Sequence, residues 1–383
     1  MKKEKLIFVL PEYDVNASTH FKYTVELAEA LAEKMELFLF VEDAKSPLEG
    51  IKVQHAYGQK FRFLPLVFLE RFFVVLLWRI RGCRKIYIHY AYLSGLIGAL
   101  VMRLTRGKSF YWHCEQRAMF EVKFQFTKKA LHHKLLQDWP FRLLIRVVHV
   151  LVTCTEVMRE YYPRHFSVSP KKISVIYNWV NVAELQRRVQ KPCVSLKKKY
   201  EINPHDKIIL FVHWLSPRKG SRRLPEIMEA ILSKRKDVTF LIVGGGPDES
   251  TLRTWVREKG WDNKIKLTSE VPNDEIPEYF SVGTIFIVPS ENEEFGRVNI
   301  EAMAMGLPIV ATKTLASQAL FSEKQKVYWS EPGDIASFAN NIERLLDNPH
   351  EIKVLKEEGF KQVRKYDKLP NVENFLALFH QSE

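Results

Sequence analysis

Glu293 and Glu301 stand eight residues apart in the segment that is richest in chemical signals. An apolar run precedes this segment, and an amphipathic helix is expected to begin near Gly296. Backbone N–H groups in the first turn of a helix lack intrahelical partners, so those of Gly296, Arg297 and Val298 would bind an anion such as a diphosphate. Eight residues of helix rise about 12 Å, which is too far for a close pair of carboxylates. The two glutamates could instead hold opposite ends of an extended ligand, or simply be solvated.

Further candidates follow other apolar runs in the second half of the chain. Lys219 and Arg218 form a basic turn after residues 207–212. A basic turn at this place could bind an anionic ligand or be merely solvated. Gly244 and Gly245 follow the next apolar run. Glycine there permits either close approach of a ligand to the backbone or a tight turn.

The first half of the chain contributes candidates of a different kind. His113 ends an apolar run, where a histidine either contacts a ligand or is a satisfied structural residue. Ser18, Thr19 and His20 follow the first apolar run and could bind hydroxyl groups or cap the next helix. The four cysteines are 31 to 40 residues apart without a CxxC pair. We therefore expect no zinc site, no disulfide framework and a reducing cytoplasm.

Alternating strand-like and helix-like patterns surround these residues. In the first half, strands are expected at 6–10, 37–41, 86–89, 109–112 and 150–153, with helices such as 20–34 and 94–104. The series restarts with strands at 207–212, 238–243, 265–267 and 284–288. This order predicts an α/β protein with two doubly wound, Rossmann-like parallel-sheet domains joined through the polar stretch 183–206. Because such sheets bind ligands at the carboxyl ends of their strands, the domains would face a central cleft.

The formal net charge of +13 is concentrated in one region. Residues 51–200 carry 28 basic and 7 acidic side chains, while the rest of the chain is slightly acidic. Such a region attracts nucleic acid, anionic lipid or phosphorylated substrates. Basic residues alternate with aromatic ones in 61–85 and 120–146, which favours interfacial membrane binding unless these apolar faces pack into the core. Since no nucleic-acid-binding motif is present, we predict that residues 60–150 bind an anionic membrane surface.

The segment 289–308 resembles the signature of retaining glycosyltransferases of family 4 (glycosyl transferases group 1), a family with the GT-B fold. The shared pattern is Pro-Ser, two glutamates separated by seven residues, then Ala-Met-Ala and Gly-x-Pro. Glu293 and Glu301 occupy the two glutamate positions. The resemblance implies that Glu301 holds the ribose hydroxyls of a sugar nucleotide and that Glu293 contacts the transferred sugar.

The segment 211–220 resembles the place where the family has Gly-Arg-Leu followed by Lys-Gly, with the Arg and Lys holding the donor diphosphate. Lys219 matches the lysine, but His213 and Trp214 replace the usual Gly-Arg. One expected cation is therefore missing, and a neighbouring arginine could supply it: Arg218, Arg222 or Arg223.

The remaining site residues follow from the same resemblance. Gly244 and Gly245 would line the donor site, and the main chain at Val271 would lie against the nucleotide base. His113 matches a histidine that lies near the transferred sugar or positions the acceptor. The loop with Ser18, Thr19 and His20 matches a glycine-rich loop near donor and acceptor, although those glycines are absent here.

The resemblance implies a hexosyltransferase that moves a sugar from a UDP- or GDP-linked donor to a hydroxyl of a glycan or lipid-linked acceptor. The acceptor would attack on the face that the diphosphate leaves, the leaving phosphate would take the proton, and no metal is expected. The domains would be an acceptor domain at 1–190, a donor domain at 191–360, and a segment 361–383 that packs back on the first. No stretch reads as a signal peptide or spanning helix. We therefore expect a cytoplasmic protein at the inner face of the cell membrane.

Two other functions fit the same sequence. A GT-B enzyme of the epimerase type would consume a sugar nucleotide without any acceptor. A non-catalytic binding protein that kept the fold is also consistent, because His213 and Trp214 alter the donor segment and a fold alone does not establish activity.

Overall fold

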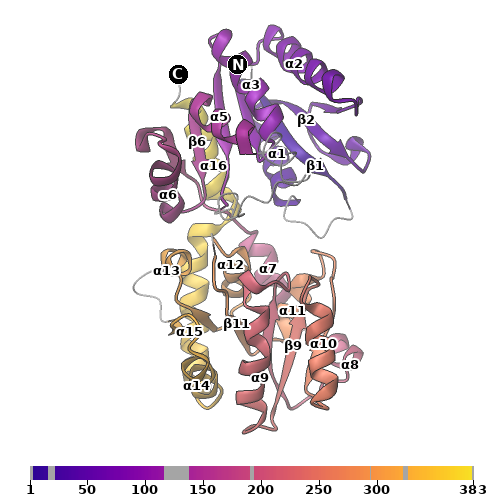
Figure 1. Cartoon of the computed structure of the whole chain (residues 1–383), viewed down its shortest axis with the longest axis vertical. Coiled ribbons are helices and arrows are strands. Elements are labelled where there is room, and N and C mark those ends of the chain that lie inside the picture. The colour runs from indigo at the N-terminus through magenta and orange to yellow at the C-terminus, as the bar shows by residue number, and fades with distance from the viewer. Residues whose placement is uncertain are drawn as a thin grey trace, which may run out of the picture. The chain divides into compact units, whose positions relative to one another are not determined.

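The computed structural model describes residues 3–15, 22–115, 138–189, 194–293, 295–321 and 327–381. The chain forms two compact units (Figure 1): unit 1 comprises Met1–Tyr177 and Asn371–Glu383, and unit 2 comprises Asn178–Pro370. Each unit contains one parallel sheet with helices packed around it, which confirms the predicted α/β class. The domain limits expected from the sequence remain a proposal.

Unit 1 contains a seven-stranded sheet in the order β3-β2-β1-β4-β5-β6-β7. Its strands are β1 (Lys5–Tyr13), β2 (Glu36–Ala44), β3 (His55–Gly58), β4 (Lys85–His89), β5 (Lys108–Trp112), β6 (Val150–Thr153) and β7 (Ile173–Val175). All neighbouring strands are parallel. The middle strands are buried on both faces, which explains why they read as continuous apolar runs in the sequence.

In its described residues, unit 1 contains the helices α1 (Lys22–Lys34), α2 (Leu64–Ile80), α3 (Tyr92–Leu104), α5 (Trp139–Val147), α6 (Glu156–Phe166) and most of α16 (Lys368–His380). Aromatic contacts attach α16 to the sheet: Phe379 lies 5.0 Å from Phe110 and 6.0 Å from Tyr87, ring centroid to ring centroid. Among the described residues, no helix has the length and apolar character needed to cross a membrane.

Unit 2 contains a six-stranded sheet in the order β10-β9-β8-β11-β12-β13. Its strands are β8 (Lys207–Val212), β9 (Val238–Val243), β10 (Ile265–Leu267), β11 (Ile285–Val288), β12 (Ile309–Thr312) and β13 (Tyr328–Ser330). Its helices are α7 (Val182–Val189), α8 (Val194–Lys199), α9 (Leu224–Leu232), α10 (Glu249–Glu258), α11 (Ile276–Val282), α12 (Arg297–Ala304), α13 (Leu315–Leu320), α14 (Ile335–Leu346) and α15 (Pro349–Gln362). The strand order reverses between β8 and β11, the kind of position where open parallel sheets bind ligands.

Candidate active site

The loops after β8 and β11 bring the predicted site residues of unit 2 together. The carbonyl oxygen of Arg218, in the β8 loop, accepts hydrogen bonds from the N–H groups of Glu291 and Asn292 at 3.1 and 3.3 Å. Lys219 follows Arg218 in the first loop, and Glu293 follows Asn292 in the second. Hydrogen bonds between their main chains therefore hold the two loops together at the point where the strand order reverses.

Two glycines allow the backbones at this point to approach so closely. Gly220 has a φ of 78°, and a Cβ there would lie 2.0 Å from the carbonyl oxygen of Pro289. Gly244 has a φ of 129°, and a Cβ there would lie 2.2 Å from the carbonyl oxygen of His213. Both positions combine a left-handed backbone with no room for a side chain, so they require glycine.

Lys219 and Glu293 form a buried ion pair, with Nζ 2.7 Å from Oε1. The two residues are only 6% and 5% exposed. Burial alone would raise the pKa of Glu293, but the charge of Lys219 and the His213 imidazole outweigh burial and hold that pKa well below its usual range. Glu293 is therefore a carboxylate whose charge is balanced within the site.

His213 faces the other oxygen of the same carboxylate. Its Nδ1 accepts the N–H of Trp214 at 2.9 Å, which places the proton of the neutral ring on Nε2. Burial, and then the charge of Lys219, lower the pKa of His213. The neutral ring therefore directs Nε2–H toward Glu293, whose Oε2 lies 3.7 Å away. The sequence marked this position only as a departure from the family pattern, so this contact was missed.

The first turn of α12 lies next to Glu293. Gly296 precedes the helix with a φ of 74°, and a Cβ there would meet Asn299 Nδ2 at 2.4 Å and Glu293 Cγ at 3.2 Å. The predicted anion-binding N–H groups of Gly296, Arg297 and Val298 belong to this turn. Asn299 is fully buried, and neither polar atom of its side chain has a hydrogen-bond partner among the described residues. Nothing in the sequence pattern indicated this residue.

Glu301 lies within α12 and pairs with Arg297, whose Nε is 3.3 Å from Oε1. Burial raises the pKa of Glu301, and the Arg297 charge opposes that rise only in part. The carboxyl therefore takes up a proton at a higher pH than an exposed glutamate would.

The remaining unit 2 candidates surround the β8 loop. The carbonyl of Gly245 accepts the N–H of Leu215 at 2.8 Å, and Val271 is buried after β10. Arg218 is exposed. The two other arginines considered as substitute cations are near carboxylates: Arg222 Nε is 3.7 Å from Asp248 Oδ1, and Arg223 Nε is 3.2 Å from Glu291 Oε1.

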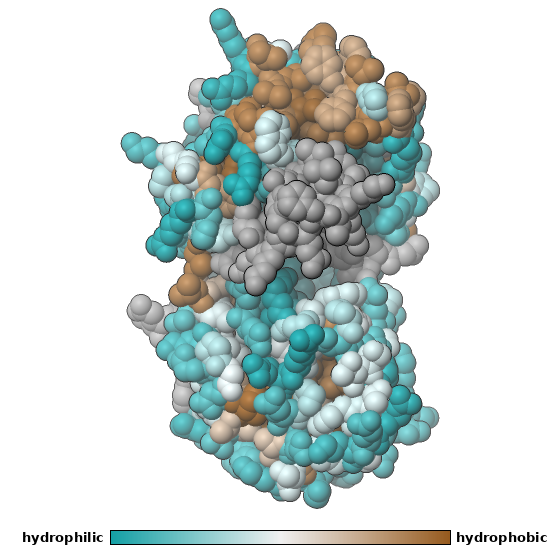
Figure 2. All heavy atoms as spheres, in the orientation of Figure 1, coloured by the Kyte–Doolittle hydropathy of each residue, from teal (hydrophilic) through white to brown (hydrophobic). Residues whose placement is uncertain are grey.

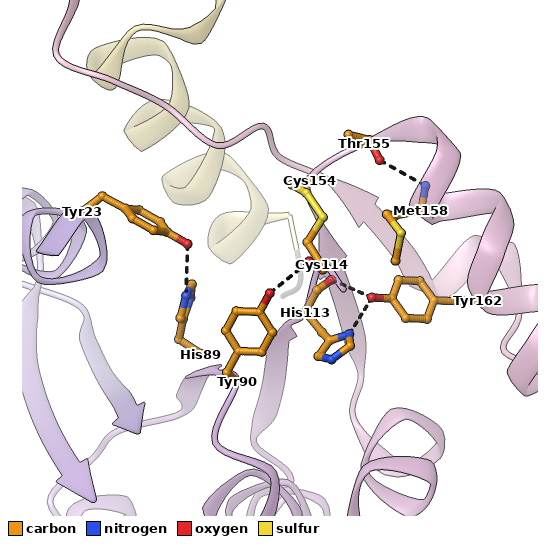
Figure 3. Close-up of a disulfide and its surroundings, with 9 residues drawn as sticks. All are labelled: Tyr23, His89, Tyr90, His113, Cys114, Cys154, Thr155, Met158 and Tyr162. Atoms are coloured by element: carbon orange, nitrogen blue, oxygen red, sulfur yellow. Dashed lines mark hydrogen bonds between the residues drawn. A yellow bond between two sulfur atoms is a disulfide. The ribbon is translucent and has the colours of Figure 1, made fainter. Parts of the chain in front are cut away.

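In unit 1, His113 lies at the carboxyl end of β5 and is 2% exposed (Figure 3). Its Nδ1 is 2.6 Å from the hydroxyl of Tyr162, which itself donates to the carbonyl of His113 at 2.8 Å. Because that hydroxyl has one proton, Nδ1 must be the donor to its oxygen, leaving Nε2 of a neutral ring as an acceptor. Ser18, Thr19 and His20 lie outside the described residues.

A disulfide joins Cys114 and Cys154, so the expectation of no disulfide was wrong (Figure 3). Trp112 of β5 pairs with Val152 of β6, and each cysteine follows two residues later, which brings the Cα atoms to 5.8 Å. This adjacency depends on strand register rather than on cysteine spacing. Among the described residues, no group of three or more His, Cys, Asp or Glu side chains could hold a metal ion.

Comparison with known proteins gives two family matches and several relatives. Residues 21–184 match the model described as Glycosyltransferase Family 4, and residues 195–362 match that of Glycosyl transferases group 1. A 2-deoxystreptamine glucosyltransferase of Streptomyces kanamyceticus is 26% identical over 245 residues, 62% of this chain and 60% of that protein. The phosphatidylinositol N-acetylglucosaminyltransferase GPI3 subunit of Saccharomyces cerevisiae is 29% identical over 213 residues, 53% of this chain and 45% of that protein. The matches thus span 60% or less of these relatives.

Solved structures share the fold over nearly the whole chain. A glycosyltransferase from Rickettsia africae has a TM-score of 0.78 at 15% identity and covers 100% of this chain and 99% of its own. Anabaena HepE in complex with UDP has a TM-score of 0.76 at 16% identity and covers 98% of this chain and 100% of its own. With the two family matches on successive halves of the sequence, the chain belongs to the group 1 glycosyltransferases of family 4 and has their GT-B fold.

Proposed function

We propose that the protein is a retaining glycosyltransferase that takes a sugar from a nucleotide-diphospho-sugar. The observation that carries this proposal is the buried Lys219–Glu293 pair beside the first turn of α12, where the strand order of unit 2 reverses. A charged pair at this depth is costly to bury, and apolar residues would stabilise the fold at least as well. Its place at the reversal of the strand order, where open parallel sheets bind ligands, therefore favours a chemical role.

The donor would lie across the loops that follow β8 and β11. Lys219, Arg218 and the first N–H groups of α12 would hold the diphosphate. Glu301 would bind the ribose hydroxyls. Gly244 and Gly245 would let the ligand approach the backbone, and the main chain at Val271 would contact the base. Structures of HepE with UDP and with UDP-glucose support a nucleotide-sugar donor, which we expect to be UDP- or GDP-linked.

Transfer would proceed by displacement on one face of the sugar. As the bond to the diphosphate breaks, negative charge grows on the leaving phosphate, and fixed N–H donors and cations stabilise that charge. The acceptor hydroxyl oxygen would bond to the anomeric carbon on the face that the diphosphate leaves, so the anomeric configuration is retained, and the leaving phosphate would take the hydroxyl proton. Glu293, held ionised by Lys219 and faced by neutral His213, would accept hydrogen bonds from sugar hydroxyls.

The acceptor side of the proposal rests on unit 1. His113 and the loop with Ser18, Thr19 and His20 would contact the acceptor, a glycan or a lipid-linked molecule. The relative named as a phosphatidylinositol N-acetylglucosaminyltransferase subunit supports a lipid acceptor. We place the protein at the cytoplasmic face of the cell membrane, bound to an anionic surface through residues 60–150, with 1–190 as acceptor domain and 191–360 as donor domain.

The test is incubation with a panel of UDP- and GDP-sugars, with and without membrane extract as the source of acceptor. The wild type should consume one donor and label an extracted product. Glu293→Ala and Lys219→Ala should abolish that labelling, while the exposed control Lys234→Ala should retain it. No donor consumption by the wild type would reject the enzyme. Consumption without extract, giving an isomerised sugar, would instead identify an epimerase.

A further inference from the structure

Helix α2 buries its two central charges together with Val67, Val75 and Trp78, and it exposes many of its other apolar side chains. Eight of its apolar side chains are between 38% and 73% exposed, among them Leu69, Phe72, Phe73, Leu77 and Ile80. Glu70 and Arg71, in the middle of the helix, are 7% and 8% exposed. A surface helix of a globular protein normally has the opposite arrangement.

Hydrogen bonds on the inner face fix this orientation of the helix. Glu70 accepts the N–H of Lys60 at 2.7 Å and the hydroxyl of Tyr57 at 2.8 Å. Arg71 donates to the side chain of Gln59 at 2.8 Å and pairs with Glu42 at 2.9 Å. Rotating α2 to bury its apolar face would break these contacts and leave charges unpaired, so the outward apolar face is a built feature.

The exposed face is continuous with a second helix. Figure 2 shows brown, hydrophobic atoms gathered over the part of unit 1 where Figure 1 places α2. Arg79 near the end of α2 donates to the carbonyl of Thr105 at 2.7 Å, which brings the exposed Leu104 of α3 beside it. A contiguous apolar surface of this kind marks a protein or membrane interaction site.

The exposed charges around this surface are basic, apart from Asp43, which pairs with Arg62 at 2.9 Å. Between residues 59 and 86 the only acidic residue is Glu70, which points inward. Exposed arginines stand at both ends of α2 and at the end of α3: Arg62, Arg81, Arg84 and Arg106. If a second copy docked through the same face, the two-fold contact would bring these arginines close to their counterparts, and they would repel one another. The negative phosphate groups of lipid headgroups would instead attract them.

We propose that α2 lies in the plane of a phospholipid bilayer, with its outward apolar face inserted at the boundary of headgroups and acyl chains. Seventeen residues of helix extend about 26 Å along the surface. The inference rests on the proposed membrane attachment and deepens it. Burial of the apolar face of α2 in the lipid becomes the main contribution to the free energy of membrane binding, and the basic residues add a smaller one. Binding should therefore occur on neutral lipid and persist at high salt.

The experiment is flotation of the full-length protein with vesicles of phosphatidylcholine alone and of phosphatidylcholine with phosphatidylglycerol. The variant Phe73→Asp/Leu77→Asp changes two side chains that are 52% and 54% exposed, so the fold should survive. Leu315→Asp, at a 73% exposed position in unit 2, is the matched control. We expect the wild type and control to bind both vesicles, and the double variant to bind at least about tenfold more weakly.

Four outcomes would overturn the inference. The double variant could bind like the wild type, or the wild type could bind no vesicle or only anionic vesicles at low salt. A wild type that forms a dimer lost in the double variant would identify a second copy as the occupant. Sugar-nucleotide binding is measured on the same samples. Because the α2 variants leave unit 2 unchanged, a failure of the membrane inference can be distinguished from a failure of the proposed donor site.

Discussion

At the scale of single residues, the site depends on a balance of buried charge. Lys219 neutralises Glu293, and His213 adds a neutral N–H toward the same carboxylate. This arrangement keeps Glu293 ionised in a place where burial alone would favour its neutral form. The protonation state of each of these three side chains therefore depends on the other two. Replacing one of them should change the charge of the site as well as remove one contact.

The first prediction concerns Lys219→Met, which would leave the carboxylate of Glu293 buried without its cation. Removing one partner of a buried pair typically costs about 3–5 kcal/mol, so the free energy of unfolding should fall by that order in urea titrations. Lys219→Met/Glu293→Leu should recover most of the stability and none of the transfer activity. An unchanged unfolding midpoint for the single variant would show that the pair is not buried as described.

The second prediction concerns pH. Burial raises the pKa of Glu301, so this carboxyl becomes protonated at a higher pH than an exposed glutamate. A ribose-binding carboxylate loses acceptor capacity when protonated, so the KM for the donor should rise as the pH falls through this raised pKa. Glu301→Gln should show a high KM that no longer changes over this range. A wild-type KM that is flat with pH, or a variant that keeps the wild-type slope, would contradict this role.

At the scale of elements, the apolar runs predicted the strands that matter most for the site. Residues 207–212 and 238–243 form β8 and β9 with the predicted bounds. Strand β3 was missed because this edge strand, His55–Gly58, is partly exposed and carries no apolar run. The contact of Lys219 with Glu293 could not be derived from spacing, because it depends on β11 pairing with β8.

The third prediction tests the turn that holds Lys219. Gly220→Ala would place a methyl group against the carbonyl of Pro289 and force the two loops apart. Gly260→Ala is the matched control, since Gly260 also has a positive φ, of 65°, but nothing lies within 4 Å of a Cβ there. Both variants should lose about 1 kcal/mol of folding free energy through backbone strain, and Gly220→Ala should lose more through the steric clash and should also lose donor affinity. Equal donor affinity in calorimetry would show that the turn does not position the site.

At the scale of the whole molecule, each unit has its own sheet and core, and the last helix belongs largely to unit 1. The fold class followed from the alternation of strands and helices. The outward apolar face of α2 did not, because the sequence shows where basic and aromatic residues alternate but not which of them a helix buries. The inward hydrogen bonds of Glu70 and Arg71 decide that question.

The fourth prediction concerns the attachment of α16. Phe379 is fully buried against Tyr87 and Phe110, so Phe379→Ala should lower the free energy of unfolding by about 3–5 kcal/mol. Leu369→Ala, at a position 70% exposed on the same helix, should change it by less than about 0.5 kcal/mol. Similar thermal unfolding of the two variants would show that α16 does not stabilise unit 1.

Calorimetric titration of UDP- and GDP-sugars into the 383-residue protein tests the donor site most directly. We expect saturable binding of one donor per chain, strongly weakened by Glu301→Gln and by Gly220→Ala and unaffected by Gly260→Ala. If no sugar nucleotide binds, or if one binds with the same affinity to the wild type and to these site variants, the donor site is not at the carboxyl ends of β8 and β11.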